Sequence, residues 1–228
     1  MAEIPKTKYG LSIFRSDDQS ILEVGIDEAG KGPMFGRVYA AAVILPKTTD
    51  EDDFNYHDLR DSKKIKSLKK LERICEYIKE NALAWSVCYQ DEKVIDDINI
   101  RQATFKAMHG AIDGVLRKIG NEKKVELMVD GNDFKPYMAM RGTMLTCVPH
   151  SCYEGGDNKF TAIAAASILA KTERDKYILE LCENNPELKE HYSIDTNKGY
   201  GTKKHMDGIQ QHGITQWHRR SYGICKNF

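Results

Sequence analysis

The length of its apolar segments limits the fold of this 228-residue chain more than any other feature. The longest are Val38–Leu45 and Ala162–Ala170. A helix needs roughly 20 apolar residues to cross a membrane, so no membrane span is predicted. The N-terminus has no apolar core or cleavage pattern, so we expect no signal peptide. Hydrophobic residues make up 41% and charged residues 30%, which is typical of a folded globular chain.

Strands come first along the chain and then alternate with helices. This order predicts an α/β protein with a mixed β-sheet flanked by helices and a small helical region at the C-terminus. We divide the chain into an N-terminal domain, residues 1–183, and a C-terminal helical region with a basic tail, residues 184–228. The predicted strands are 11–16, 20–28, 37–45, 83–89, 125–129 and 142–149, and the predicted helices are 66–81, 99–119, 161–182 and 203–212.

The charges are segregated, although 34 basic residues balance 34 acidic ones. Residues 50–61 carry six acids, residues 63–73 carry six bases, and residues 198–228 carry six more. Two clusters of basic residues are what we expect of a surface that binds a nucleic-acid phosphate backbone. The alternative is that these residues only form solvent-exposed helix faces.

Six cysteines occur without a C-x-x-C pair, which favours reduced thiols and a cytoplasmic protein. Cys147, His150 and Cys152 lack a fourth nearby ligand, so a zinc site is not expected there.

The segment Gly25–Gly36 is the strongest local signal for chemistry. Asp27 and Glu28 end an apolar strand, and a glycine-rich turn containing Gly30 and Gly32 follows at once. Such glycines permit close backbone approach by a ligand, whose oxygen the free N–H groups could bind. The segment fits neither the phosphate loop nor the dinucleotide fingerprint. A plain turn with two solvated acids is the alternative.

Two further acids occupy similar places. Asp130 ends the apolar strand 125–129, and Asp157 precedes the helix that begins near Thr161. A turn or helix-cap role is the alternative for each. Carboxylates that converge in a dry cleft raise one another's pKa, and hard oxygen ligands favour Mg²⁺ or Mn²⁺.

Other short motifs accompany these acids in a fixed order. With them the chain resembles ribonuclease HII, the type 2 ribonuclease H family, over about residues 21–224. The ordered set is very specific, although each motif alone is weak to moderate. The motifs are Asp27-Glu28-Ala29-Gly30-Lys31-Gly32, Asp61-Ser62-Lys63-Lys64, Val129-Asp130-Gly131, Gly156-Asp157, residues 164–171, Arg174-Asp175, residues 198–202 and His218-Arg219-Arg220-Ser221-Tyr222.

The resemblance implies the ribonuclease H fold and a role for each matching residue. Asp27, Glu28, Asp130 and Asp157 would be the catalytic and metal-binding acids of a two-metal site for Mg²⁺ or Mn²⁺, with Asp27 as the bridging ligand. The Gly30-Lys31-Gly32 loop would meet the ribose 2′-OH and its phosphate. Tyr200 would pack on the sugar after the ribonucleotide. The positions expected near the substrate backbone are Lys63, Ser167, Lys171 and Arg174.

The implied activity is cleavage of the RNA strand of RNA/DNA hybrids. A nick 5′ of a ribonucleotide embedded in duplex DNA is implied too. The cleaved strand would carry 3′-OH and 5′-phosphate ends. The implied roles are the removal of ribonucleotides from DNA and the removal of RNA primers. We expect a monomer that binds no membrane.

Three features depart from the usual family pattern. Lys31 stands where arginine is commoner, and Arg37 where many members have proline. The 27-residue interval between Asp130 and Asp157 predicts an extended hairpin or loop at 132–146.

Three other functions compete with this prediction. Ribonuclease HIII usually carries an additional N-terminal domain, and only about 20 residues precede the first motif strand here. A non-catalytic hybrid-binding protein gains nothing from clustered anions. Gln211, Ile214 and Trp217 have the spacing of a sliding-clamp peptide, but the same stretch matches the family's own C-terminal motif, so clamp binding is not expected.

Overall fold

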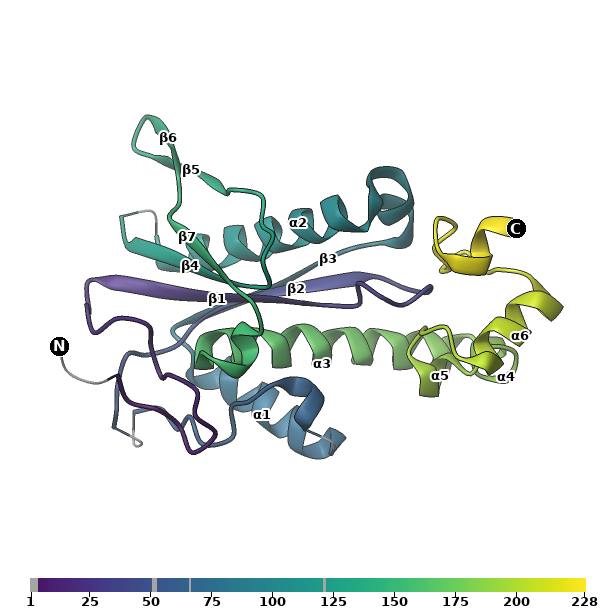
Figure 1. The fold of residues 1–228 in the computed structure, drawn as a ribbon, viewed down its shortest axis with the longest axis horizontal. Coiled ribbons are helices and arrows are strands. Elements are labelled where there is room, and N and C mark those ends of the chain that lie inside the picture. Colours follow the sequence, from purple (N-terminus) through teal and green to yellow (C-terminus); the bar gives the residue numbers. More distant parts are fainter. Residues whose placement is uncertain (1–3, 51–52, 66, 121) are drawn as a thin grey trace.

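A computed structural model describes residues 4–50, 53–65, 67–120 and 122–228. Parts of the acidic stretch 50–61 and the first residue of the predicted helix 66–81 therefore lie outside the described residues. A five-stranded mixed sheet with the order β3-β2-β1-β4-β7 lies at the centre (Figure 1). Its strands are β1 Ile21–Ala29, β2 Val38–Ile44, β3 Ala84–Gln90, β4 Lys124–Asp130 and β7 His150–Tyr153.

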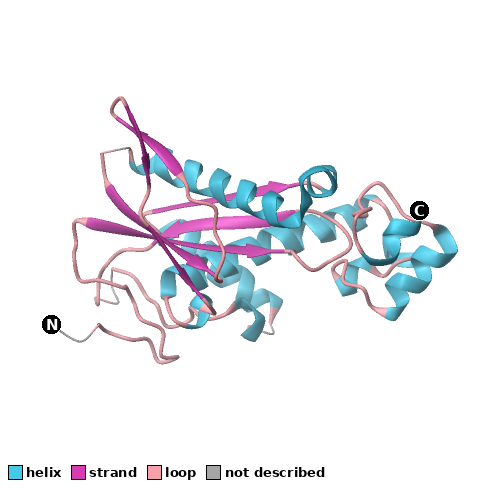
Figure 2. Cartoon of the chain, turned by 45° about the horizontal axis from the view of Figure 1, so that its top comes forward, coloured by secondary structure: helices cyan, strands magenta, loops and turns pink. Residues whose placement is uncertain are grey.

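Helices cover both faces of this sheet (Figure 2). One face packs on α2 (Glu92–Ile119) through side chains such as Val24, Ala42 and Met108. The other face packs on α1 (Leu68–Asn81) and α3 (Thr161–Asn184). β2 is buried along its whole length because helices lie on both of its sides. The predicted fold class is thus confirmed.

The C-terminal elements pack at one end of the sheet (Figure 1). Phe35 is fully buried there among side chains from the end of α3 and from residues 188–225. The division between residues 183 and 184 remains a prediction. The C-terminal elements are α4 Glu187–Glu190, α5 Ile194–Asn197, α6 Lys203–His212 and η3 Gly223–Asn227.

Two of the strand predictions are wrong. Residues 11–16 form only isolated bridges at Ser12, because the Glu23 carboxylate accepts the backbone N–H groups of Arg15 and Ser16. Residues 142–149 are not one strand. Gly142 turns the chain at φ 60°, so that β5 (Met138–Arg141) pairs with β6 (Met144–Cys147), while β7 joins the main sheet. The segment predicted to be a hairpin or loop at 132–146 thus contains a hairpin, whose strands run from Met138 to Cys147.

The helix predicted at 99–119 begins earlier, at Glu92, and is kinked. Asp91 accepts the N–H of Val94 and begins the first segment. Asn99 has φ 64°, and its side chain accepts the N–H of Gln102, so it begins the second segment at the predicted residue.

Candidate active site

Two neighbouring parallel strands deliver three of the four predicted acids to one edge of the sheet. Ile26 of β1 pairs with Val129 of β4, so Asp27 and Asp130 follow at the same level on adjacent strands. Glu28 comes directly after Asp27, while β1 continues to Ala29. Parallel register is therefore what brings carboxylates a hundred residues apart together.

The fourth acid reaches the same place through a short connection. The Asp130 carboxylate accepts the backbone N–H of Gly156 at 2.7 Å, which fixes the 3₁₀ turn η2 (Gly156–Asn158) beside β4. Asp157 lies in this turn and is 4% exposed. Its side chain does not cap α3, whose N-cap is Phe160, so the helix-cap alternative does not hold.

The electrostatics of the four acids reflect this convergence. Burial raises the pKa of Asp27 well above its usual value, and the charges of Glu28 and Asp130 raise it further. Burial, with the charges of Asp61 and Asp130, raises the pKa of Asp157. These carboxylates repel one another, and a bound cation would relieve that repulsion.

Lys63 supplies positive charge among these acids. Burial opposes its charged form, but Asp157, Asp61, Asp27 and Asp130 outweigh burial and raise its pKa. Asp61 also begins the turn η1 (Ser62–Lys64) by accepting the N–H of Lys63 at 2.9 Å. Asp61 was not predicted as a site residue, although its motif was part of the resemblance.

Each acid has a protein hydrogen-bond or ion-pair partner. Asp27 accepts the N–H of Glu28 at 2.7 Å, and Glu28 pairs with Lys31 Nζ at 2.8 Å. Asp157 accepts from Asn158 Nδ2 at 2.9 Å. Among the described residues, no three His, Cys, Asp or Glu side chains already form a metal-binding group. The donor set, four carboxylates in mutual repulsion, nevertheless fits a hard divalent cation.

Glu28 lines a cleft that we call the main cleft. It collects all eight residues predicted to bind substrate, from four separate segments. Ser62 and Asp175 also line this cleft. Neither was predicted as a site residue, although both belong to motifs that match the family. The lining residues are Glu28, Ala29, Gly30, Lys31, Gly32, Ser62, Lys63, Ser167, Lys171, Arg174, Asp175 and Tyr200.

Packing along α3 places the polar residues of the main cleft. The Ser167 hydroxyl lies 3.0 Å from that of Ser62, so α3 and η1 meet there. Lys171 pairs with Asp175 one turn later. Arg174 is only 3% exposed, and its guanidinium donates to the carbonyls of Phe35 and Lys198. Arg174 therefore ties the glycine-rich loop to the chain before Tyr200.

The Tyr200 side chain is half exposed at 52% and lies beside the glycine loop. A Cβ on Gly32 would be 3.4 Å from the Tyr200 ring. Behind it, His205 Nδ1 lies 2.9 Å from the Tyr200 carbonyl, and His205 Nε2 lies 3.1 Å from His218 Nε2. These two buried histidines hold the backbone while the ring faces the cleft.

The structure also explains why Arg37 stands where many family members have proline. Its guanidinium lies 4.0 Å from the ring centre of Tyr89 and 4.3 Å from that of Tyr177. Cation–π contact with two aromatic rings favours arginine there. Arg37 thus packs between α3 and β3.

The predicted basic surface needs two corrections. Asp58 pairs with Lys70 at 2.7 Å and with Arg73 at 3.2 Å, so the acidic stretch neutralises part of the basic helix. Arg219, counted in the basic tail, is fully buried. Neither feature could be predicted from the sequence. Asp58 is distant in sequence from Lys70 and Arg73, and the C-terminal segment that carries Arg219 packs back into the core.

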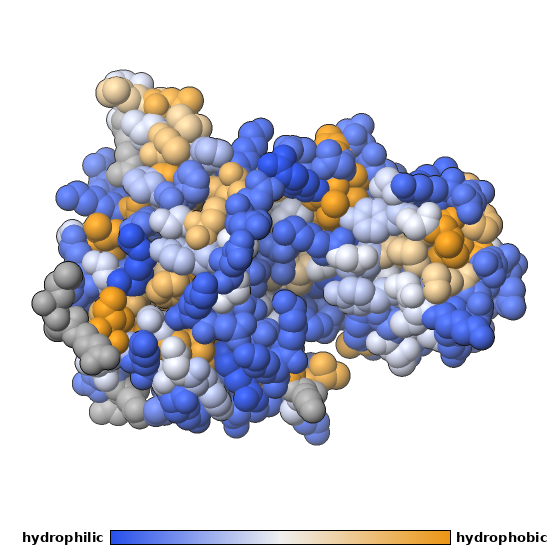
Figure 3. Space-filling model, viewed as in Figure 1, coloured by the Kyte–Doolittle hydropathy of each residue, from blue (hydrophilic) through white to orange (hydrophobic). Residues whose placement is uncertain are grey.

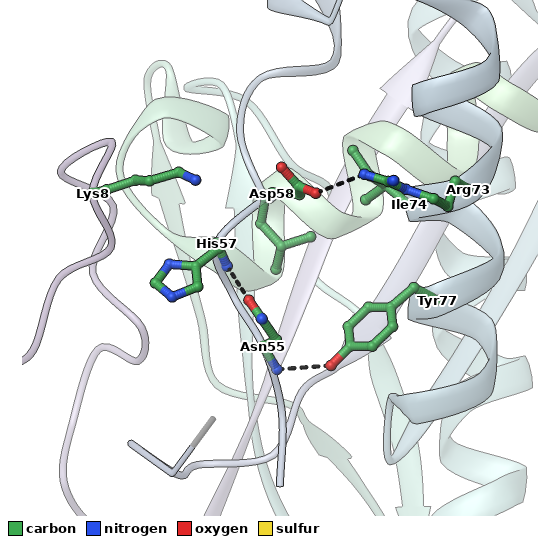
Figure 4. A pocket seen from close by; sticks show the side chains of 8 residues that line it. Lys8, Asn55, His57, Asp58, Arg73, Ile74 and Tyr77 are labelled. Carbon is green, nitrogen blue, oxygen red and sulfur yellow. Dashed lines mark hydrogen bonds and ion pairs between the residues drawn. The ribbon is translucent and has the colours of Figure 1, made fainter. Parts of the chain in front are cut away.

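A second cleft lies between the N-terminal segment and α1 (Figure 4). The Tyr77 hydroxyl accepts the N–H of Asn55 at 2.7 Å, and the Asp58–Arg73 pair spans its edge. It contains none of the predicted site residues. Ile214 and Trp217, the apolar positions of the clamp-like spacing, pack against the C-terminal core around Phe35.

The fold and the main cleft together define a class of protein. A cluster of carboxylates stands at the ends of central strands, and one of them, Glu28, shares a cleft with lysines, an open glycine loop and an aromatic ring. This combination is typical of a nuclease that works on a polynucleotide backbone. The sequence model described as Ribonuclease HII matches residues 24–225. Ribonuclease HII of Bacteroides thetaiotaomicron is 42% identical over 207 residues, covering 91% of this chain and 92% of the relative. The chain belongs to the ribonuclease HII family and is a ribonuclease H hydrolase.

Solved structures share the fold. Ribonuclease HII in a PCNA complex from Archaeoglobus fulgidus matches with a TM-score of 0.64 and 21% identity, covering 89% of this chain and 95% of that one. Bst-RNase HIII in complex with Mn²⁺ matches with a TM-score of 0.60 and 16% identity, covering 84% of this chain and 70% of that one. The fold is common to both, and the sequence match decides for the ribonuclease HII family over ribonuclease HIII.

Proposed function

We propose that this chain is a metal-dependent endonuclease that nicks duplex DNA on the 5′ side of an embedded ribonucleotide. We propose that it also cleaves the RNA strand of RNA/DNA hybrids, leaving 3′-OH and 5′-phosphate ends. The observation that carries the proposal is the continuity of the carboxylate edge with the glycine loop, since Glu28 and residues 30–32 line one cleft. The bond cut would then lie next to the group that identifies RNA.

Asp27, Glu28, Asp130 and Asp157 would hold Mg²⁺ or Mn²⁺, and a two-metal site is our expectation. Such ions supply activation of water and stabilisation of the leaving oxygen. A related ribonuclease HIII structure is described as a Mn²⁺ complex. The chain's own contribution is to assemble the acids on β1, β4 and η2 and to keep Asp27 buried.

Substrate choice would come from the glycine loop and Tyr200. Only RNA offers a 2′-OH to the backbone N–H groups of Lys31 and Gly32. Tyr200 presents an aromatic face that tolerates any base, so cleavage should not depend on sequence. Lys63, Lys171 and Lys31 would balance phosphate charge, because all three line the cleft.

The setting we propose is a cytoplasmic monomer that removes ribonucleotides and RNA primers. All six cysteines are free, which supports a reducing compartment. None of the helices in the described part of the chain has the length and hydropathy of a membrane span. An archaeal relative is described in complex with PCNA. We do not expect clamp binding through Ile214 and Trp217, because both are partly buried against the C-terminal core.

The test uses an end-labelled DNA duplex with one internal ribonucleotide, incubated in Mg²⁺, Mn²⁺ or EDTA. We expect a metal-dependent nick 5′ of the ribonucleotide. Asp130→Asn should lower the rate at least 10²-fold with the fold intact, because it removes a carboxylate from the cluster. Asp133→Asn is the matched control, since Asp133 is exposed and pairs with Arg101 at the surface.

Other outcomes separate the alternatives. Cleavage of a long RNA/DNA hybrid but not of the single ribonucleotide would contradict the junction-nicking part of the proposal. Binding without cleavage in any metal would contradict the enzymatic assignment of this chain acting alone. Retained turnover in Asp130→Asn would remove Asp130 from the metal-binding set.

A further inference from the structure

Arg219 is a buried guanidinium whose side-chain hydrogen bonds within the described residues go to the glycine loop and its continuation. It is 0% exposed, and no ion pair with Asp or Glu is found for it in the described part of the chain. Its Nε donates to the Gly36 carbonyl at 2.8 Å, and its Nη1 to that of Pro33 at 2.7 Å. Its Nη1 and Nη2 donate to the carbonyls of Lys31 at 3.2 Å and Gly30 at 2.7 Å.

These bonds decide which way the loop N–H groups point. In a planar trans peptide the C=O and the following N–H lie on opposite sides. When the carbonyls of Gly30 and Lys31 turn toward Arg219, the N–H groups of Lys31 and Gly32 turn away from it, toward the exposed side. Neither N–H donates to a protein acceptor among the described residues. Two adjacent donors are therefore left for a ligand oxygen in the main cleft.

A second group supports the same carbonyl. The Tyr222 hydroxyl donates to the Lys31 carbonyl at 2.9 Å, and the Arg219 guanidinium lies 5.1 Å from the Tyr222 ring centre. Both residues belong to the C-terminal motif that matches the family and that the mechanism above does not use. The C-terminal segment thus reaches back across about 190 residues to the substrate loop.

We propose that Arg219, assisted by Tyr222, is a positioning residue that sets discrimination for the 2′-OH by fixing the peptide planes of residues 30–32. The inference rests on the proposed function, because it assumes that this loop reads a ribose. A buried guanidinium without a carboxylate partner is costly, and here only carbonyl oxygens offset that cost. Its planar fork suits several carbonyls at once, which a lysine ammonium cannot reproduce.

The experiment measures binding, so it does not depend on bound metal. Anisotropy in EDTA gives Kd for a DNA duplex and for the same duplex with one ribonucleotide, and the ratio reports 2′-OH recognition. We expect Arg219→Lys to lower this ratio about tenfold, the loss of roughly one charged hydrogen bond. Tyr222→Phe should lower it about threefold. Kd for the all-DNA duplex should stay near the wild-type value in both variants.

Cys225→Ala is the matched control, because Cys225 is buried in the same C-terminal core without a hydrogen bond to the loop. Its ratio should equal that of the wild type even if its melting temperature falls. Wild-type ratios in folded Arg219→Lys and Tyr222→Phe would overturn the inference, as would an equal loss in the control. If Arg219→Lys does not fold, Tyr222→Phe decides alone. A wild type that neither discriminates nor cleaves contradicts the proposed function itself.

Discussion

Gly25 is the position at which helix α3 presses most closely on the central strand. A Cβ built on Gly25 would lie 2.1 Å from the carbonyl carbon of Ala162, 2.2 Å from its oxygen and 2.6 Å from the N of Ile163. Ordinary contacts between such atoms begin near 3.5 Å. Gly25→Ala therefore forces the first turn of α3 away from β1 by more than about 1 Å, because no flexible side chain is available to yield.

The expected cost has a structural and a catalytic part. Overpacking of a core costs about 1–3 kcal/mol. For a chain of this size about 1 kcal/mol lowers the melting temperature by roughly 2–4 °C, so we expect a fall of about 2–12 °C. The same helix carries Ser167, Lys171 and Arg174 into the main cleft, and Asp157 lies just before it. A displacement of about 1 Å costs on the order of 10²-fold in rate.

Calorimetry and the single-ribonucleotide assay measure these two parts. Gly110→Ala is the control, since its Cβ would meet the Cys88 Sγ at 2.5 Å, which can rotate away, and the Cys88 Cβ at 3.2 Å, with no backbone atom among these contacts. Gly110 lies within α2, where alanine is favoured over glycine by roughly 1 kcal/mol. The control should keep its activity and lose little stability. A Gly25→Ala protein with wild-type melting temperature and rate would refute the packing argument.

Three further predictions test other parts of the molecule. Tyr200→Ala should slow cleavage of a single embedded ribonucleotide about tenfold more than that of a long hybrid, and equal losses would refute a junction-reading role. Burial and the charge of His205 lower the pKa of His218 to about 3. The unfolded chain then takes up the proton first, so the unfolding free energy should fall by up to about 1.4 kcal/mol per pH unit below pH 6.5. Urea titrations should show that the unfolding free energy falls less between pH 7 and pH 5 in His218→Gln than in the wild type. The same fall in both proteins would exclude His218 as the cause. Lys47→Met should cost about 1.5–3 kcal/mol in the same urea titration, because it leaves the Glu23 carboxylate, which is 6% exposed and 2.9 Å from Lys47 Nζ, with only the N–H groups of Arg15 and Ser16; a cost below about 1 kcal/mol would contradict this.

An apolar face remains on the β5–β6 hairpin. Met138 pairs with Cys147 and Met140 with Leu145, so these four exposed side chains share one face. The hairpin projects from the sheet, and an apolar patch covers it (Figures 1 and 3). Nothing in the sequence pattern predicted that the extended segment would leave this face uncovered.

Features that depend on local pattern could be predicted from the amino-acid sequence. Asp27, Glu28 and Asp130 lie in the last residues of apolar strands, and side-chain alternation together with strand length was enough to place them at strand ends. Asn99 begins a helix at the predicted residue because side-chain capping is a local interaction. The resemblance added Asp157, which local pattern alone left as a helix cap.

Features that depend on contacts between distant segments could not be predicted from the sequence and became visible in the fold. Parallel register set Asp27 beside Asp130, and the basic tail proved to contain the buried Arg219. The acidic stretch neutralised Lys70 and Arg73 through Asp58. The physical reason is the same in each case. A charge or a backbone carbonyl takes its role from whichever partner the fold brings within about 3 Å, and sequence periodicity does not specify partners many residues away.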